Sequence, residues 1–109
     1  DMERDFTYIS DVVDGIVSSI EKDFDYEIFN LGNSRPVKLM YFVELLEKYL
    51  NKKAEKNFLP MQDGDVLRTY ADLNKSNELL GYNPKVSIEE GLKRFCNWFL
   101  DNKEWLLKL

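Results

Sequence analysis

Apolar residues recur at helical spacing in two long stretches of the chain. Such spacing predicts amphipathic helices over residues 10–22 and 38–51. The first stripe consists of Val13, Ile16, Val17, Ile20 and Phe24, and the second of Leu39, Phe42, Val43, Leu46 and Leu50. Ser10 stands at the start of the first stretch and can cap its N-terminus.

Two further helices are predicted in the C-terminal third. Asp72 can cap a short helix that ends at Leu80, because Gly81 suits the left-handed position just past a helix end. Ser87 and Glu90 have the spacing of a capping box, in which each side chain accepts the other residue's amide. The helix that follows should run to about Asp101.

The apolar tail, residues 105–109, either extends the last helix or packs as a separate segment. Three short segments predict strands: 6–9, which is β-branched and aromatic, 27–31, and 54–59, which Pro60 ends. The polar stretch 61–70 predicts a loop. The order is therefore β-α-β-α-β-α-α, a small mixed α/β domain with about three short strands and four helices, and with too few strands for a doubly wound fold.

Composition narrows the possible chemistry. The 109 residues carry a net charge of −5, no histidine and one cysteine. Catalytic sites built on histidine, zinc sites of the His or paired-Cys type and internal disulfides are therefore excluded. The acidic balance argues against nucleic-acid binding, which depends on Lys and Arg. No apolar run approaches the roughly 18 residues that span a bilayer, and no signal-peptide pattern is present, so we expect a cytoplasmic location.

Three features that resemble catalytic signals have simpler interpretations. Tyr49 and Lys53 show the Tyr-xxx-Lys spacing of a proton-transfer pair, but a match is common by chance in a lysine-rich chain, and lysines favour helix C-termini. The five glycines are too scattered for a GxGxxG dinucleotide loop. Cys96 lies beside the stripe of the last helix, which predicts a core residue rather than a nucleophile. We therefore predict no catalytic residue and no metal ligand here.

Two places have side chains suited to binding a ligand. Arg4 precedes a predicted strand, where a guanidinium can hold a phosphate through two hydrogen bonds. Asp65 follows a glycine in a loop, and its carboxylate can accept hydrogen bonds from two sugar hydroxyls. Arg68 lies near in the same loop. Taken singly, a surface arginine is more often solvated and a glycine turn is more often only a turn.

Several motifs that occur in order along the chain favour the binding interpretation of these residues. Residues 4–16 (RDFTYISDVVDGI), 30–32 (NLG), 61–72 (MQDGDVLRTYAD) and 80–92 (LGYNPKVSIEEGL) resemble segments of extended short-chain dehydrogenase/reductases (SDRs) that act on nucleotide sugars, most closely the UDP-glucuronate 4-epimerase branch. The chain departs from the family pattern at Ser10 and Leu67, where Asp and Pro are usual.

The resemblance implies the C-terminal substrate-binding region of such an enzyme, covering 1–109 and lacking the Rossmann domain. That missing domain would bind NAD, carry the catalytic Tyr-xxx-Lys and form the homodimer. By residue, the resemblance assigns Arg4 to the substrate diphosphate and Asp65 to the uridine ribose. Gln62 stands where some relatives have a phosphate-binding arginine, which leaves Arg68 as a second cation. Because the chain begins with Asp1 and Met2, we expect a fragment of a longer protein.

The function expected is thus binding of a UDP-sugar within an NAD-dependent epimerase, with no activity and no NAD binding in the isolated fragment. Two alternatives stay open. The chain is a stand-alone nucleotide-binding or protein-interaction module, the latter through the apolar tail, or it is the same region of a nucleotide-sugar dehydratase or decarboxylase.

Overall fold

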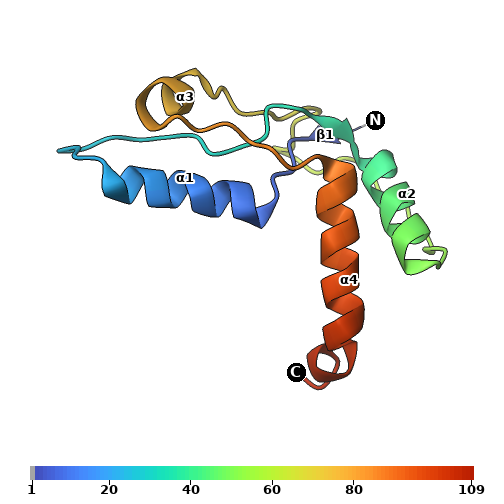
Figure 1. Ribbon diagram of the computed structural model, residues 1–109. Coiled ribbons are helices and arrows are strands. Elements are labelled where there is room, and N and C mark those ends of the chain that lie inside the picture. Colours follow the sequence, from blue (N-terminus) through green and yellow to red (C-terminus); the bar gives the residue numbers. More distant parts are fainter. Residues whose placement is uncertain (1) are drawn as a thin grey trace.

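The computed structural model describes residues 2–109, which form four helices and a two-stranded antiparallel sheet (Figure 1). The mixed α/β class and the four helices are as predicted. The elements in chain order are β1 (Glu3–Arg4), α1 (Ile9–Glu21), β2 (Val37–Lys38), α2 (Leu39–Leu50), α3 (Asn74–Leu80) and α4 (Ile88–Leu106). None of these helices has the length and apolar character to cross a membrane.

The strands lie elsewhere than predicted. The sheet pairs Glu3 with Lys38 and Arg4 with Val37. Residues 6–8 have no strand pairing, because the chain turns there into α1, whose first residue is Ile9. Residues 27–31 and 54–59 are not strands in the described part of the chain either. The composition of 27–31 is compatible with a strand, but a strand also requires a neighbouring backbone to complete its hydrogen bonds.

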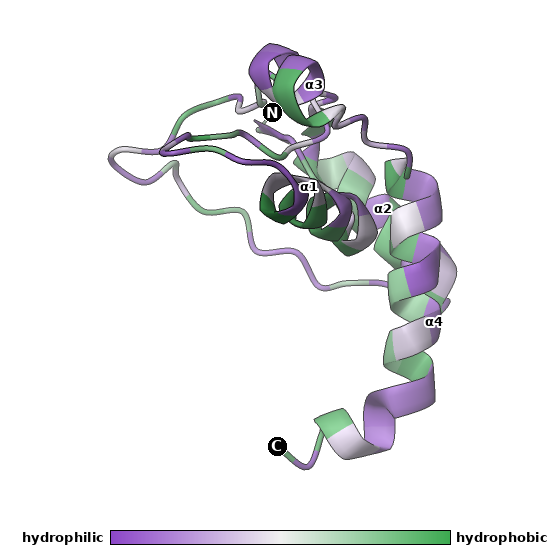
Figure 2. Ribbon diagram, turned by 60° about the vertical axis from the view of Figure 1, so that its left-hand side comes forward, coloured by the Kyte–Doolittle hydropathy of each residue, from purple (hydrophilic) through white to green (hydrophobic). Residues whose placement is uncertain are grey.

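The first two helices confirm the prediction made from the apolar periodicity, although the N-cap of α1 differs from the predicted one. Tyr8, and not Ser10, is the N-cap residue, and no side chain caps this end. α2 ends where Asn51 takes the left-handed conformation with φ 53°, and the Asn51 amide donates to the Glu47 carbonyl. Both helices are amphipathic (Figure 2).

The last two helices are where predicted, but Leu73, and not Asp72, is the N-cap residue of α3, and α4 runs past Asp101. Asp72 Oδ1 accepts the Asn74 amide at 3.0 Å, and Gly81 ends α3 with φ 65°. Ser87 Oγ accepts the Glu90 amide at 3.2 Å. The return half of the capping box is not formed, because the Glu90 carboxylate accepts from Arg94 Nε at 3.0 Å. α4 continues through Leu106, so the helix includes the first two residues of the apolar tail.

The helices pack as two pairs that share no common core. α2 packs against α4 around Leu45, Leu92 and Cys96, while α1 packs against α3 near Leu80 and Tyr82. α4 projects away from the α1–α3 pair (Figure 1). Both pairs are small, so polar contacts from the connecting segments must help to fix their arrangement.

The most connected of these polar groups is the Asp5 carboxylate. It accepts backbone amides from Asn33 at 3.2 Å, Ser34 at 2.9 Å, Arg35 at 3.4 Å and Ala71 at 3.0 Å. These amides come from two segments that are distant in sequence. One side chain therefore ties β1 to the segment before β2 and to the loop before α3.

Asp11 has a similar role at the start of α1. Its side chain is buried, and its two oxygens accept the amides of Lys85 at 3.0 Å and Val86 at 3.1 Å. Tyr82 is buried beside α1 and donates its hydroxyl to the Gly32 carbonyl at 2.6 Å. The chain before α4 is thereby fixed against α1 and against the segment that contains Gly32.

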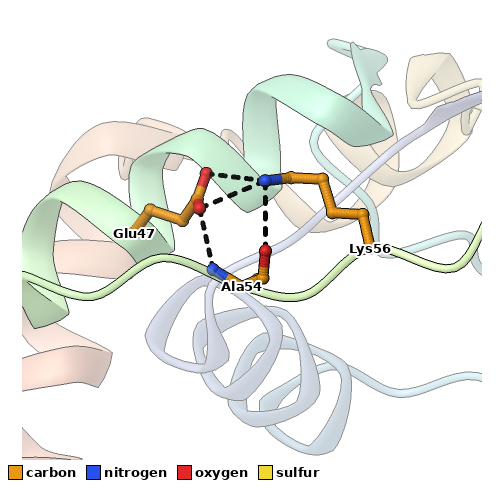
Figure 3. A network of polar contacts seen from close by, with 3 residues as sticks. All are labelled: Glu47, Ala54 and Lys56. Atoms are coloured by element: carbon orange, nitrogen blue, oxygen red, sulfur yellow. Dashed lines mark hydrogen bonds and ion pairs between the residues drawn. The ribbon is translucent and has the colours of Figure 1, made fainter.

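A third carboxylate fixes the end of α2. Glu47 accepts the Ala54 amide at 2.9 Å and forms an ion pair with Lys56 Nζ at 3.2 Å (Figure 3). These two contacts, with the Ala54 amide contributing more, lower the pKa of Glu47. The backbone that leaves α2 is therefore folded back along the helix end.

The Asp5 contacts make a prediction about stability. Asp5→Asn removes the charge and converts one acceptor oxygen into a donor, so it should lower the free energy of unfolding by about 2–3 kcal/mol. Urea denaturation measures the change. Asp63→Asn, at an exposed loop aspartate, is the matched control. Equal denaturation midpoints for the two variants would contradict the role given to Asp5.

The link between α2 and α4 makes a prediction about pH. Tyr41 donates its hydroxyl to Glu89 Oε1 at 2.7 Å. This hydrogen bond is the main cause that lowers the pKa of Glu89 below 4.5 and raises the pKa of Tyr41 above 10.0. The contribution of this hydrogen bond to stability is therefore complete between pH 4.5 and pH 10.0. It is lost as the pH falls through the lowered pKa of Glu89, and also as the pH rises through the raised pKa of Tyr41.

Tyr41→Phe should therefore lose less stability than the parent chain when the pH drops from about 7 to about 3. Urea midpoints at the two pH values measure the loss, with Tyr26→Phe at an exposed tyrosine as control. The interpretation fails if Tyr41→Phe shows the full acid sensitivity of the parent.

Candidate functional site

Arg4 lies on β1, between β2 and the segment that contains Arg68. Its strand pairs with β2 on one side, and on the other Glu3 forms a parallel bridge with Arg68. The Glu3 amide donates to the Leu67 carbonyl at 2.8 Å, and Thr69 donates to the Glu3 carbonyl at 3.3 Å. Arg4 is also the residue before Asp5, so its backbone is held on three sides.

The two arginines of the candidate site differ in their charge partners. Arg68 Nε lies 3.2 Å from Glu3 Oε2, and its guanidinium lies over the Tyr70 ring at 5.2 Å. Arg4 Nη1 donates to the neighbouring Glu3 carbonyl at 2.8 Å. Within residues 2–109 no carboxylate forms an ion pair with Arg4. The positive charge of Arg4 is thus less compensated than that of Arg68.

Gln62 and Asp65 lie at the two ends of one tight turn, as the glycine between them predicts. The Asp65 amide donates to the Gln62 carbonyl at 3.2 Å, and Gly64 has φ 88°. A positive φ at the third residue of a turn is a conformation that glycine adopts without strain. Both side chains are exposed, which leaves the Asp65 carboxylate accessible to a ligand.

The four predicted binding residues therefore form two groups. Arg4 and Arg68 lie on adjacent bridged segments, while Gln62 and Asp65 share the turn just before Arg68. No hydrogen bond or ion pair within the described residues joins Asp65 to either arginine. The arrangement provides a cation and a hydrogen-bond acceptor on connected elements, the groups that can bind a phosphate and a sugar hydroxyl.

The Tyr49–Lys53 pair does not form the geometry of a proton-transfer pair. α2 ends at Leu50 and Asn51 turns left-handed, so Lys53 lies beyond the helix. The cation over the Tyr49 ring is Lys48, at 5.7 Å. The structure thus agrees with the simpler interpretation of this spacing.

Sequence reasoning missed the structural carboxylates Asp5 and Asp11. Both lie inside the 4–16 motif, in which Arg4 is the predicted binding residue. The position of Asp11 in the sequence could have indicated its structural role. Asp11 lies on the side of the helix opposite the apolar stripe, beside Gly15, and both residues are buried. A small residue and a buried acid on one helix face indicate that backbone from elsewhere approaches closely.

Comparison with known proteins shows which proteins the chain is similar to. The chain is 84% identical over 108 residues to an uncharacterized protein of Methanocaldococcus jannaschii. It is 44% identical over 102 residues to a UDP-glucuronate 4-epimerase of Thermodesulfobacterium geofontis. These matches cover 99% and 93% of this chain but only 33% and 31% of the relatives. No protein-family model matches the chain.

The fold agrees with the sequence match. A crystal structure of the UDP-glucuronic acid 4-epimerase of Bacillus cereus, in complex with UDP-glucuronic acid and NAD, superposes with a TM-score of 0.81 at 34% identity. The match covers 92% of this chain and 32% of that chain. The chain matches the C-terminal part of SDR-type UDP-sugar epimerases. It spans about a third of the length of the curated relatives that it matches.

The one cysteine is not placed to act as a nucleophile. Cys96 is fully buried on α4, and burial raises the pKa of its thiol. A buried thiol with a raised pKa has little thiolate at neutral pH and is a poor nucleophile.

We expect Cys96 to react with Ellman's reagent at least about 100-fold more slowly in the native chain than in urea. A matched control moves the thiol by one position, as Asn97→Cys in a Cys96→Ser background, to an exposed site. That thiol should react at nearly the same rate in both conditions. Rapid native labelling of Cys96 would show that the site is open.

Proposed function

We propose that residues 1–109 are the nucleotide-sugar-binding region of a longer NAD-dependent UDP-sugar 4-epimerase, and that the chain alone has no epimerase activity. The observation that carries the proposal is the match of nearly the whole chain to about a third of UDP-glucuronate 4-epimerases, in sequence and in fold. The other two thirds of such an enzyme have no counterpart in these residues.

We propose that Arg4 binds the diphosphate of the substrate. Its backbone is fixed by β1 pairing and by the neighbouring Asp5 contacts, and its charge has no carboxylate partner within the described residues. A guanidinium in that state can form two charge-assisted hydrogen bonds to phosphate oxygens. Arg68 is the secondary cation, because it must first separate from Glu3.

We propose that Asp65 binds the ribose. An exposed carboxylate on a rigid turn can accept hydrogen bonds from two adjacent hydroxyls. Gln62, at the other end of the turn, can donate an amide hydrogen bond to a phosphate oxygen but brings no charge. The affinity for the diphosphate in this region therefore depends mainly on Arg4.

NAD does not fit the residues present. The described glycines serve packing or turns: a Cβ on Gly15 would lie 2.6 Å from the Leu31 side chain, and one on Gly91 would lie 3.2 Å from Tyr8. None of these glycines opens a phosphate-binding loop. In the proposed enzyme, NAD supplies hydride transfer at the sugar and is held outside these residues. The contribution of this chain is binding energy from the nucleotide, remote from the reacting carbon.

The remaining assignments follow from the same proposal. The partner is a UDP-sugar, and neither nucleic acid nor a membrane is a partner. The proposed homodimer of the parent enzyme forms through the part outside these residues, and its cytoplasmic location stays a prediction.

Calorimetry with UDP-glucuronate tests the role of Arg4. The chain alone should bind more weakly than about 1 mM, because much of the pocket wall is absent. A chimera, in which this chain replaces the aligned 108 residues of the M. jannaschii relative, should bind measurably. Arg4→Gln in the chimera should weaken binding by about 10- to 100-fold through loss of charge-assisted hydrogen bonds.

Arg94→Gln is the matched control, since Arg94 is exposed on α4 and pairs with Glu90 within its own helix. The assignment is overturned if Arg4→Gln and Arg94→Gln bind the nucleotide equally well. Epimerisation by the 109-residue chain alone would overturn the proposed inactivity.

A further inference from the structure

The ion pair between Glu3 and Arg68 lies on the face of β1 opposite to Arg4. Successive side chains of a strand point to opposite faces, so the side chains of Glu3 and Arg4 point away from each other. Residues that are paired across neighbouring strands share a face. Arg68 is a bridge partner of Glu3 and shares its face, whereas Val37 is the partner of Arg4. The two arginines of the candidate site therefore lie on different faces of the same bridged segments.

The Arg68 guanidinium is held on the Glu3 face by two partners. Its Nε lies 3.2 Å from Glu3 Oε2, and its Cζ lies 5.2 Å from the centre of the Tyr70 ring. To reach a phosphate on the Arg4 face, the guanidinium would have to leave both partners and pass around the bridged backbone. Direct contact of both arginines with one phosphate group is therefore disfavoured by the geometry.

The same ion pair joins the two elements that carry the proposed ligand contacts. Glu3 is the residue before Arg4 on β1. Arg68 follows Asp65 by three residues, and Asp65 ends the tight turn 62–65. A contact between Glu3 and Arg68 thus limits how far the turn that carries Asp65 can move relative to Arg4.

The backbone alone provides little to hold these elements together. The Glu3 amide donates to the Leu67 carbonyl at 2.8 Å, and the Thr69 amide donates to the Glu3 carbonyl at 3.3 Å. Among the described residues, these are the only backbone–backbone hydrogen bonds that link residues 61–70 to the rest of the chain. A pairing this short is marginally stable, so a side-chain contact at the same place has a measurable influence on it.

We propose that Glu3 and Arg68 are positioning residues for substrate binding. Their ion pair holds the turn that carries Asp65 at a set distance from Arg4, and neither side chain touches the ligand. Both side chains are partly exposed, at 30% for Glu3 and 57% for Arg68. Exposed ion pairs are weak, so the expected effect on affinity is about two- to fivefold. This inference rests on the proposed function, because it takes Arg4 and Asp65 as the ligand contacts.

Reversal of the two charges separates positioning from direct contact. In the chimera with the M. jannaschii relative, Glu3→Gln and Arg68→Gln should each weaken UDP-glucuronate binding by about two- to fivefold. The double variant Glu3→Arg with Arg68→Glu forms the pair with reversed signs at the same net charge. It should bind within about twofold of the parent chimera. Binding as weak as that of Arg68→Gln overturns the proposal, because position 68 would then need its own positive charge.

A second comparison shows whether Arg68 acts through Arg4. In a chimera that already carries Arg4→Gln, Arg68→Gln should weaken binding by less than about twofold further, because residues that act as a unit are not additive. An undiminished loss in that background overturns the proposal. Glu90→Gln is the matched control, since it removes an exposed ion pair with Arg94 on α4. That variant should bind as the parent chimera does.

Amide exchange tests the ion pair without a ligand. In the 109-residue chain, Arg68→Gln should speed the exchange of the Glu3 and Thr69 amides by about two- to fivefold, because the bridge that protects them opens more often. The Ser34 amide, which donates to Asp5, should exchange at the parent rate, as should all three amides in Glu90→Gln. Unchanged exchange of both bridge amides in Arg68→Gln overturns the proposal.

The proposed function and the positioning role fail separately. Binding that is lost in Arg4→Gln but is not restored by reversal of the charges retains the proposed function and overturns the positioning role. Absence of UDP-glucuronate binding by the parent chimera overturns the proposed function, and amide exchange then still decides whether the ion pair holds the bridge.

Discussion

The Asp5 carboxylate is the constraint on which the arrangement of the connecting segments depends. Its oxygens accept amides from the segment 33–35 and from Ala71. Gly32 must be glycine for this to occur, because a Cβ there would lie 2.8 Å from Asp5 Oδ2 and 2.6 Å from the Ala71 Cβ. Three distant segments therefore meet at one side chain, and charge-assisted hydrogen bonds hold them together where no large apolar core is available.

Arg4 owes its position to the same contact. The strand that carries it has only two residues, which is too short to be stable by itself. Asp5 holds the strand at one end, and the bridge between Glu3 and Arg68 holds it at the other. A charged side chain on a fixed backbone loses less conformational entropy on binding than one on a mobile loop. The hydrogen bonding of an aspartate thus prepares the neighbouring arginine for a ligand.

The sequence predicted the helices and the chemical side chains better than the strands. The periodicity of α2 and the glycine after α3 act locally, so they could be recognised without knowledge of tertiary contacts. Residues 27–31 contain Ile and Phe as a strand would, but no strand forms there among the described residues, because a strand also needs a neighbouring backbone. The same limit applies to α1: its stripe predicted an amphipathic helix correctly, yet nothing in that pattern shows which side faces these 109 residues.

The polar contacts show a second limit of prediction from the sequence. The motif 4–16 predicts Arg4 as a binding residue, whereas Asp5 and Asp11 in the same motif accept hydrogen bonds from backbone amides. A motif therefore mixes binding and structural residues, and only the hydrogen bonds separate them. With the structural residues set aside, Arg4 and Asp65 are the proposed ligand contacts, and Arg68 forms an ion pair with Glu3.

A crystal structure of the chimera with bound UDP-glucuronate tests most directly which of these residues bind the ligand and which hold the backbone. The account predicts that the Arg4 guanidinium lies within about 3 Å of a diphosphate oxygen and that Asp65 contacts the ribose, while Asp5 still accepts the same backbone amides. A nucleotide bound away from Arg4 and Asp65, or an Asp5 carboxylate turned toward the ligand, would contradict it.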